Sequence, residues 1–118
     1  MVQNLKLQNL FKLSSKVTVY VPSTIDINVN IDNTEYVNKT AELLSDCFGG
    51  ATQTNALGCW KSPTAGLVKE KVVLVYSNCT DNDLNENIEK VVDWCEKMRD
   101  ELRQDAISLE INGELYFI

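Results

Sequence analysis

Residues 16–21, Lys-Val-Thr-Val-Tyr-Val, alternate polar and apolar side chains with a period of two, and the pattern stops at Pro22. This period is typical of a strand with one buried face, so we expect the first core strand here. The segment 51–60 has no helical period and is expected to be a second strand, with a bulge near Gly58. The segment 67–77 contains the continuous apolar run 72–76, which predicts a central strand covered on both faces.

Two other segments repeat apolar residues with the spacing of an α-helix. In the first segment the steps are four, three and four residues, through Val37, Ala41, Leu44 and Phe48. In the second the steps are four, three, four, three and four, through Leu84, Ile88, Val91, Cys95, Met98 and Leu102. Both segments therefore predict helices that pack one face against the rest of the protein.

The ends of these helices also have sequence signals. Asp32 with Glu35, and Asp83 with Glu86, have the spacing of capping boxes at the two helix starts. Gly49 stands where a left-handed residue would end the first helix.

Three remaining segments complete the prediction. Residues 106–111 alternate again, and Asn112-Gly113 predicts a tight hairpin that returns 114–118 as a last strand. Residues 25–31 fit a short edge strand or an extended loop, and we expect a loop because Asn and Asp are frequent in it. The leucines at 5, 7, 10 and 13 fit a short helix and an extra strand equally well.

The order of these elements, βαββαβ, predicts an α+β ferredoxin-like sandwich, with two helices on one antiparallel sheet and a C-terminal β-hairpin extension. A length of 118 residues suits a single hydrophobic core, and no linker-like stretch interrupts the chain. We therefore expect one domain, 1–118, made of an N-terminal extension, 1–15, and a core, 16–118.

The charge and hydropathy of the chain exclude several classes of partner. Eleven basic and 17 acidic residues give a net charge of −6, which argues against direct binding to nucleic acid. The longest apolar run is too short to cross a bilayer, and residues 1–13 do not resemble a signal peptide. We therefore expect a cytoplasmic protein with no membrane partner, located in the host cytoplasm if a phage encodes it.

The chain has four cysteines and no histidine, a composition that disfavours a metal site. Cys47, Cys59, Cys79 and Cys95 are too far apart for a zinc knuckle or a redox pair. We expect reduced, mostly buried thiols, with disulfides or an all-thiolate metal site as the less favoured alternatives. No cofactor is expected.

Several short motifs occur in a recognisable order. They are Phe48-Gly49-Gly50-Ala51-Thr52, Gly58-Cys59-Trp60, Gly66-Leu67-Val68-Lys69-Glu70 and Gln104-Asp105-Ala106-Ile107. This order resembles the FGG-T, G-x-W, G-x-x-x-E and Q-E/D-A-V pattern of a family of small ferredoxin-like proteins from bacteria and from their phages and prophages. The resemblance implies the same fold, a phage or mobile-element setting and no established catalytic residues.

Two groups of residues are candidate binding sites. Trp60 and Glu70 flank a short turn between neighbouring strands, so they can meet on one sheet face and, with Arg103 and Gln104, line a pocket for a small ligand. The alternative is that Trp60 belongs to the core and Glu70 to a solvated strand end. The second group is a row of carboxylates on the second helix, Glu86, Glu89, Asp93, Glu96 and Asp100.

This acidic row is either an ordinary solvated helix face, in which Lys90 and Lys97 pair with Glu86 and Asp93, or a surface that occupies a basic groove of another protein. Without histidine or a known catalytic motif, the sequence predicts a protein that is not an enzyme. Our leading hypothesis is a phage-type protein that binds a host protein stoichiometrically, as an anti-defence, anti-CRISPR-like inhibitor would. The alternative is a small-molecule or nucleotide-binding homodimer, in which the apolar residues 115–118 are covered by the partner.

Overall fold

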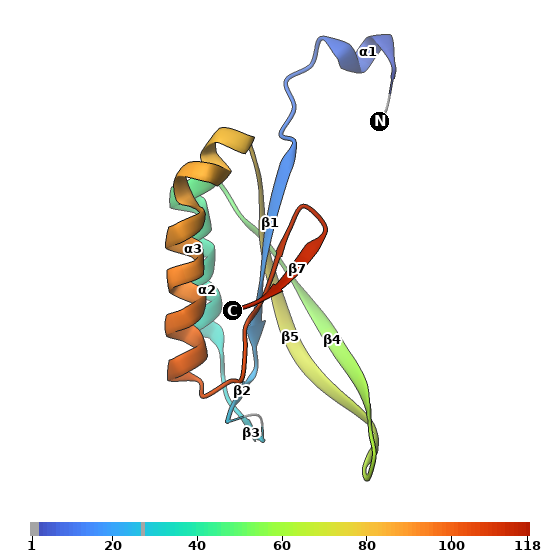
Figure 1. Cartoon of the computed structure of the whole chain (residues 1–118), viewed down its shortest axis with the longest axis vertical. Coiled ribbons are helices and arrows are strands. Elements are labelled where there is room, and N and C mark those ends of the chain that lie inside the picture. Colours follow the sequence, from blue (N-terminus) through green and yellow to red (C-terminus); the bar gives the residue numbers. More distant parts are fainter. Residues whose placement is uncertain (1–2, 27) are drawn as a thin grey trace.

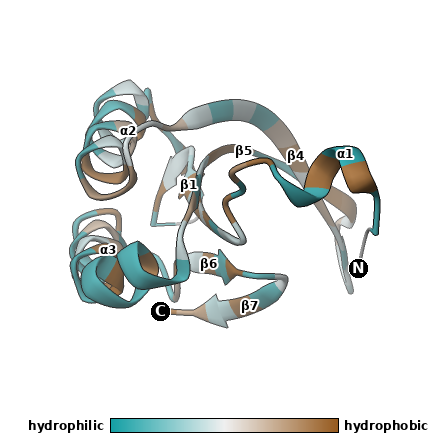
Figure 2. Ribbon diagram, turned by 90° about the horizontal axis from the view of Figure 1, so that it is seen from above, coloured by the Kyte–Doolittle hydropathy of each residue, from teal (hydrophilic) through white to brown (hydrophobic). Residues whose placement is uncertain are grey.

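The computed structural model describes residues 3–26 and 28–118. A five-stranded antiparallel sheet has the order β4-β5-β1-β6-β7, and two long helices cover one of its faces (Figures 1 and 2). The strands of this sheet are β1 (Ser15–Pro22), β4 (Thr52–Ser62), β5 (Gly66–Cys79), β6 (Ser108–Ile111) and β7 (Glu114–Phe117). The helices on it are α2 (Thr34–Phe48) and α3 (Asp81–Glu101). This arrangement confirms the predicted ferredoxin-like α+β fold and its C-terminal hairpin.

The core lies between the helices and one face of the sheet. Val17, Val19 and Val21 of β1 are 0% exposed, as are Leu44 of α2 and Met98 of α3. They belong to the periodic apolar positions of the sequence, and their burial supplies the main drive for folding. No helix of the described residues packs on the opposite face of the sheet (Figures 1 and 2). The prediction that the run 72–76 is covered on both faces is therefore wrong within the described chain, where Val72, Leu74 and Tyr76 are only half-buried.

The N-caps of the two helices differ from the predicted ones. The N-cap of α2 lies one residue after the predicted Asp32, and the N-cap of α3 lies three residues before the predicted Asp83. In α3 the N-cap is Thr80, whose Oγ1 accepts a hydrogen bond of 3.1 Å from the backbone N–H of Asp83. In α2 the N-cap is Asn33, which makes no side-chain cap, while Asp32 accepts from the N–H of Thr34. Both boxes were misplaced because several consecutive residues here have side chains that suit a cap. Gly49, with φ of 90°, ends α2 as predicted.

The strand register corrects a second detail. β4 and β5 pair without interruption from Thr52 with Tyr76 to Ser62 with Gly66, so no bulge interrupts the pairing at Gly58. Gly58 pairs with Glu70, and because glycine has no side chain, none covers the sheet next to Glu70 at this position of β4. The Asn112-Gly113 turn confirms its prediction, with positive φ values of 52° and 84° joining β6 to β7.

The two uncertain segments also have defined structure. β2 (Thr24–Ile25) and β3 (Val29–Asn30) form a two-stranded ladder, so the prediction of a simple loop over 25–31 is wrong at these positions, while residue 27 lies outside the described residues. A short helix, α1 (Leu5–Gln8), projects from the start of β1 with no buried residue (Figure 1). No helix in the described part of the chain is both long enough and apolar enough to span a membrane.

Candidate functional site

Two of the predicted ligand residues share the open face of the sheet, opposite the helices. Gly58 pairs with Glu70, and Trp60 pairs with Val68. Because side chains alternate along a strand and paired residues point to the same side, Trp60 and Glu70 lie on one face, diagonal to each other. That face is the open one, since the alternate residue Val75 is 0% exposed beneath the helices.

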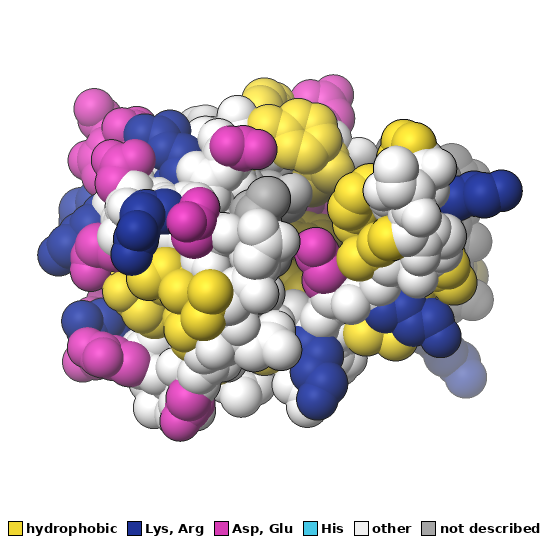
Figure 3. All heavy atoms as spheres, turned by 90° about the horizontal axis from the view of Figure 1, so that it is seen from below, with side chains coloured by type: hydrophobic (Ala, Val, Ile, Leu, Met, Phe, Trp, Pro, Cys, Tyr) yellow, Lys and Arg dark blue, Asp and Glu magenta, His cyan; other side chains and the backbone are white. Residues whose placement is uncertain are grey.

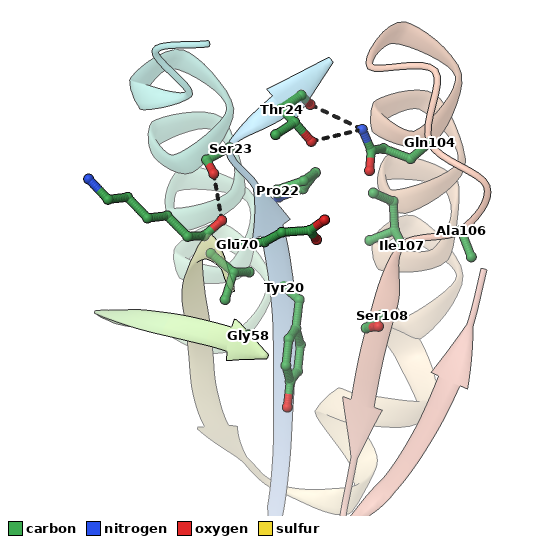
Figure 4. A pocket seen from close by; sticks show the side chains of 12 residues that line it. Tyr20, Pro22, Ser23, Thr24, Gly58, Glu70, Gln104, Ala106, Ile107 and Ser108 are labelled. Carbon is green, nitrogen blue, oxygen red and sulfur yellow. Dashed lines mark hydrogen bonds between the residues drawn. The ribbon is translucent and has the colours of Figure 1, made fainter. Parts of the chain in front are cut away.

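A cavity of about 260 Å³ lies on this face beside Glu70 (Figure 4). The wall is formed by β1 and the residues after it, by β4 and β5, and by the segment after α3. The lining residues are Tyr20, Pro22, Ser23, Thr24, Gly58, Glu70, Lys71, Val72, Gln104, Ala106, Ile107 and Ser108. In Figure 4 the carboxylate of Glu70 points into the cavity toward Ile107. The structure therefore brings together Glu70 and Gln104, which are 34 residues apart in the sequence.

Gln104 is held in this wall by backbone groups. Its Nε2 donates hydrogen bonds to the carbonyl oxygens of Thr24, at 3.1 Å, and Leu102, at 3.2 Å. The preceding residue, Arg103, has a left-handed φ of 51°, which turns the chain from the end of α3 toward β6. Arg103 itself is exposed and does not line the cavity, so the structure separates it from the other three predicted ligand residues.

Tyr20 forms the lower wall of the cavity with its ring and directs its hydroxyl away from it (Figure 4). That hydroxyl donates to Oε1 of Glu110 at 3.3 Å. Partial burial, together with the nearby Glu110 carboxylate, raises the pKa of Tyr20, so the phenol stays protonated near neutral pH. Tyr20 therefore offers the cavity an aromatic surface.

A second, wider hollow of about 650 Å³ adjoins the first. Trp60, which is 51% exposed, and Ile31 line it, and it shares Ser23, Thr24 and Glu70 with the first cavity. The alternative prediction that Trp60 belongs to the core is wrong because the tryptophan is at the surface of the open face. Glu70 thus lies between a small cavity that contains Gln104 and a broader hollow that contains Trp60.

Sequence reasoning missed Tyr20 and Ser108 as lining residues. Tyr20 lies on the strand side opposite Val19 and Val21, and Ser108 begins β6, which pairs with β1. The ferredoxin-like topology places the first strand beside the strand of Glu70, and the strand of Ser108 on the other side of the first strand. Alternation along the first strand, read with that topology, would have been the signal.

The acidic row predicted on the second helix lies on α3, and all five of its carboxylate residues are exposed. Within the described residues, the ion pair of this row joins Asp100 to Arg99, with 3.0 Å between Nε and Oδ1, and neither Lys90 nor Lys97 pairs with the row. Figure 3 shows acidic and basic side chains interspersed over the helical side of the molecule. The role of this row in binding a host protein stays a prediction.

The thiols do not form a site in the described part of the chain. Cys79 and Cys95 are buried, Cys47 is half-buried and Cys59 is exposed, all without disulfides. Burial raises the pKa of Cys95 to about 12, so this thiol stays protonated. Among residues 3–26 and 28–118, no group of three or more cysteine or acidic side chains is arranged to hold a metal ion.

Comparison with known proteins gives matches in structure and none in sequence. No family model and no curated protein matches the chain. A phage SAM lyase in complex with S-methyl-5′-thioadenosine aligns with a TM-score of 0.64 and 17% identity, over 95% of this chain and 94% of its own. A phage SAM lyase in the apo state aligns with a TM-score of 0.62 and 18% identity, over 92% and 94%. CutA from Synechococcus elongatus aligns with a TM-score of 0.49 and 7% identity, over 93% and 86%.

These structures show that the fold is shared with an enzyme of phages, and they contradict the prediction that the chain is not an enzyme. That prediction rested on the absence of histidine, which most nucleophile-and-base mechanisms use. A missing histidine does not exclude every reaction, because a substrate can supply both its own nucleophile and a good leaving group. Such a reaction needs no general base.

Proposed function

We propose that this chain binds S-adenosylmethionine (SAM) in the cavity beside Glu70 and cleaves its carbon–sulfur bond, as a lyase. The observation that carries the proposal is the carboxylate of Glu70, which points into a cavity on the open face of a sheet whose fold is shared with a phage SAM lyase. The proposal keeps the small-molecule alternative that the sequence left open and adds a reaction to it. The same comparison supports a phage or prophage setting.

The groups in the cavity suit a cationic nucleoside. SAM carries two positive charges, on its sulfonium and α-ammonium groups, and Glu70 supplies a negative charge opposite one of them. The ring of Tyr20 and the half-buried Val72 supply apolar surface for the uncharged parts of the ligand. The adjoining hollow beside Trp60 adds the volume that a whole nucleoside requires.

The cleavage can proceed with groups of the substrate alone. The α-carboxylate of SAM attacks its own γ-carbon, a carbon–oxygen bond forms, and the carbon–sulfur bond breaks with its electron pair going to sulfur. The products are 5′-methylthioadenosine and homoserine lactone, with no proton or water consumed. The role of the protein is then to hold the methionine portion folded, so that the carboxylate reaches the carbon from the side opposite sulfur.

The test is incubation of the purified chain with SAM, with chromatographic detection of 5′-methylthioadenosine over time. The expected result is release of this product in proportion to protein concentration, above the slow breakdown of SAM alone. Absence of product, together with absence of SAM binding by calorimetry, would overturn the proposal. Binding without product would remove the lyase step and leave a SAM-binding protein.

A further inference from the structure

The carboxamide of Gln104 is oriented by the backbone around it. Its Nε2 donates to the carbonyl oxygens of Thr24 and Leu102, and lies 3.5 Å from the Thr24 hydroxyl. Rotating the amide by half a turn would place Oε1 against two carbonyl oxygens, losing two hydrogen bonds and adding repulsion. The amide nitrogen is therefore fixed toward Thr24.

These acceptors are themselves fixed by the fold. The carbonyl of Leu102 also accepts from the backbone N–H of Asp26 at 2.8 Å, and the N–H of Gln104 donates to the carbonyl of Arg99 at 2.9 Å. The end of α3 and the start of the β2–β3 ladder are thus joined at this point. The orientation of the Gln104 amide follows from this junction and needs no ligand to set it.

As a consequence, Oε1 of Gln104 faces the cavity. Figure 4 shows the amide nitrogen directed to Thr24 and the amide oxygen directed to the interior, on the side of Ile107. No donor of the described residues forms a hydrogen bond with this oxygen, and it is not sealed from solvent. It is therefore an oriented hydrogen-bond acceptor that is open to a donor group of a ligand.

The remaining polar side chains of the cavity differ in kind, since the Ser108 hydroxyl can donate or accept a hydrogen bond. Glu70 offers an acceptor-only carboxylate, and the hydroxyl of Tyr20 is already engaged with Glu110. A ligand group that meets Oε1 of Gln104 or the Glu70 carboxylate must therefore be a donor, and a group with an acceptor facing Oε1 is repelled.

We propose that Oε1 of Gln104 accepts a hydrogen bond from an amino group of the bound ligand and makes the site select amino-bearing ligands over analogues that lack that group. This inference rests on the proposed function, whose substrate carries two such groups, the 6-amino group of adenine and the α-ammonium group. Gln104 is on this account a specificity-determining residue.

The experiment measures binding by calorimetry for two matched pairs of probes. The first pair is 5′-methylthioadenosine and 5′-methylthioinosine, which differ in having a 6-amino or a 6-oxo group. The second pair is SAM and its analogue without the α-amino group. The wild-type chain is expected to prefer the amino member of one pair by about tenfold or more, since a mismatched polar group in such a site is costly. The pair that discriminates identifies which amino group meets Gln104.

Two variants separate the acceptor from the structural role of the amide. Gln104→Met removes both functions, and Gln104→Lys keeps donors for the Thr24 and Leu102 carbonyls while removing the acceptor. In Gln104→Lys the two members of the discriminating pair are expected to bind with affinities within about threefold of each other, or with the preference reversed. The control Arg103→Lys, at the neighbouring exposed residue that does not line the cavity, is expected to keep the preference.

The outcomes distinguish this inference from the proposed function. If a folded Gln104→Lys variant keeps the wild-type preference between the two probes, the inference is overturned and the proposed function is not affected. The same holds if the wild-type chain binds both members of both pairs equally. A wild-type chain that binds none of the four probes would overturn the proposed function and the inference together.

Discussion

The two faces of the sheet use the same strands and have opposite surroundings. On the helical face, Val17, Val19, Val21 and Val75 are 0% exposed and contact α2 and α3. On the open face, Tyr20, Val72 and Leu74 remain half-buried, and Glu70 and Trp60 are exposed. Neighbouring residues on one strand therefore have unrelated roles, because the alternation of side chains assigns them to different faces.

This difference separates stability from ligand binding. The helical face is apolar and closed, so changes there alter packing first. The open face holds exposed side chains such as Glu70 and Trp60, and changes at these positions should leave the folded state nearly intact. The predictions below test this separation.

The largest effect is expected for Leu44→Ala on the helical side, where the side chain is 0% exposed. Loss of this side chain leaves a cavity and should lower the free energy of unfolding by about 3 kcal/mol. The matched control is Leu57→Ala, at a leucine that is 53% exposed, with an expected loss below about 1 kcal/mol. Urea unfolding of both variants gives the comparison, and equal losses would contradict it.

Glu70→Gln is expected to act on ligand binding alone. It removes the negative charge from the cavity and should lower kcat/KM for SAM cleavage by about 10- to 100-fold, the value of a hydrogen bond to a charged group. The melting temperature should stay within about 2 °C of the wild type, because surface substitutions rarely alter stability.

The control for Glu70 is the acidic row of α3. Glu89→Gln, and the triple reversal of Glu89, Asp93 and Glu96 to Lys, should leave cleavage nearly unchanged. A loss of cleavage in the triple variant with Glu70 intact would show that the helical face takes part in substrate binding. It would also break the separation of the two faces.

A smaller effect is expected for Thr40→Val within the helical layer. Thr40 is 0% exposed, and its Oγ1 accepts from Nε1 of Trp94 at 2.8 Å. Valine keeps the shape and leaves the indole N–H without its partner, which should cost about 1 to 2 kcal/mol. The control Thr54→Val, at an exposed position of β4, should change the unfolding free energy by less than about 0.5 kcal/mol.

The smallest effect concerns Asp81, at the start of α3. The hydroxyls of Ser15 and Ser14 donate to its carboxylate and lower its pKa in the folded protein. A carboxyl group whose pKa is lower in the folded than in the unfolded protein stabilises the folded state at pH values above its unfolded pKa, about 3.9. This stabilisation disappears as the pH falls through the folded-state pKa. Thermal melts should therefore show a difference between wild type and Asp81→Asn near neutral pH that shrinks on acidification. A difference independent of pH would contradict the assignment.

Periodicity, together with the Asn112-Gly113 turn signal, was sufficient to predict the order of the main helices and strands. The steps through Val37 and Leu44, and through Val91 and Met98, identified the buried faces of both helices. The capping residues could not be chosen because Thr80, Asp81 and Asp83 all suit a helix start, and only the backbone geometry distinguishes them. The short β2–β3 ladder escaped prediction because each of its strands has only two residues.

The candidate site was predictable in part. The short turn between two strands predicted that Trp60 and Glu70 lie on one face. In the structure the predicted Gln104 lines the same cavity as Glu70. Arg103 was included because it is next to Gln104, and in the structure it is exposed and does not line the cavity. The orientation of the Gln104 amide depends on Thr24, 80 residues away, which no local pattern indicates.

The hydrogen bond between Gln104 and Thr24 also affects how the site can form during folding. The walls of the cavity come from three parts of the chain, within 20–24, at Gly58 with 70–72, and within 104–108, so the cavity exists only after the early and late parts of the chain have met. A ligand held there acts as a reversible cross-link that the unfolded chain cannot bind, and at 100 times its dissociation constant it would stabilise the protein by about 2.7 kcal/mol. Slow amide hydrogen exchange should then appear together in all three segments when ligand is added, because none of them can open alone without releasing it.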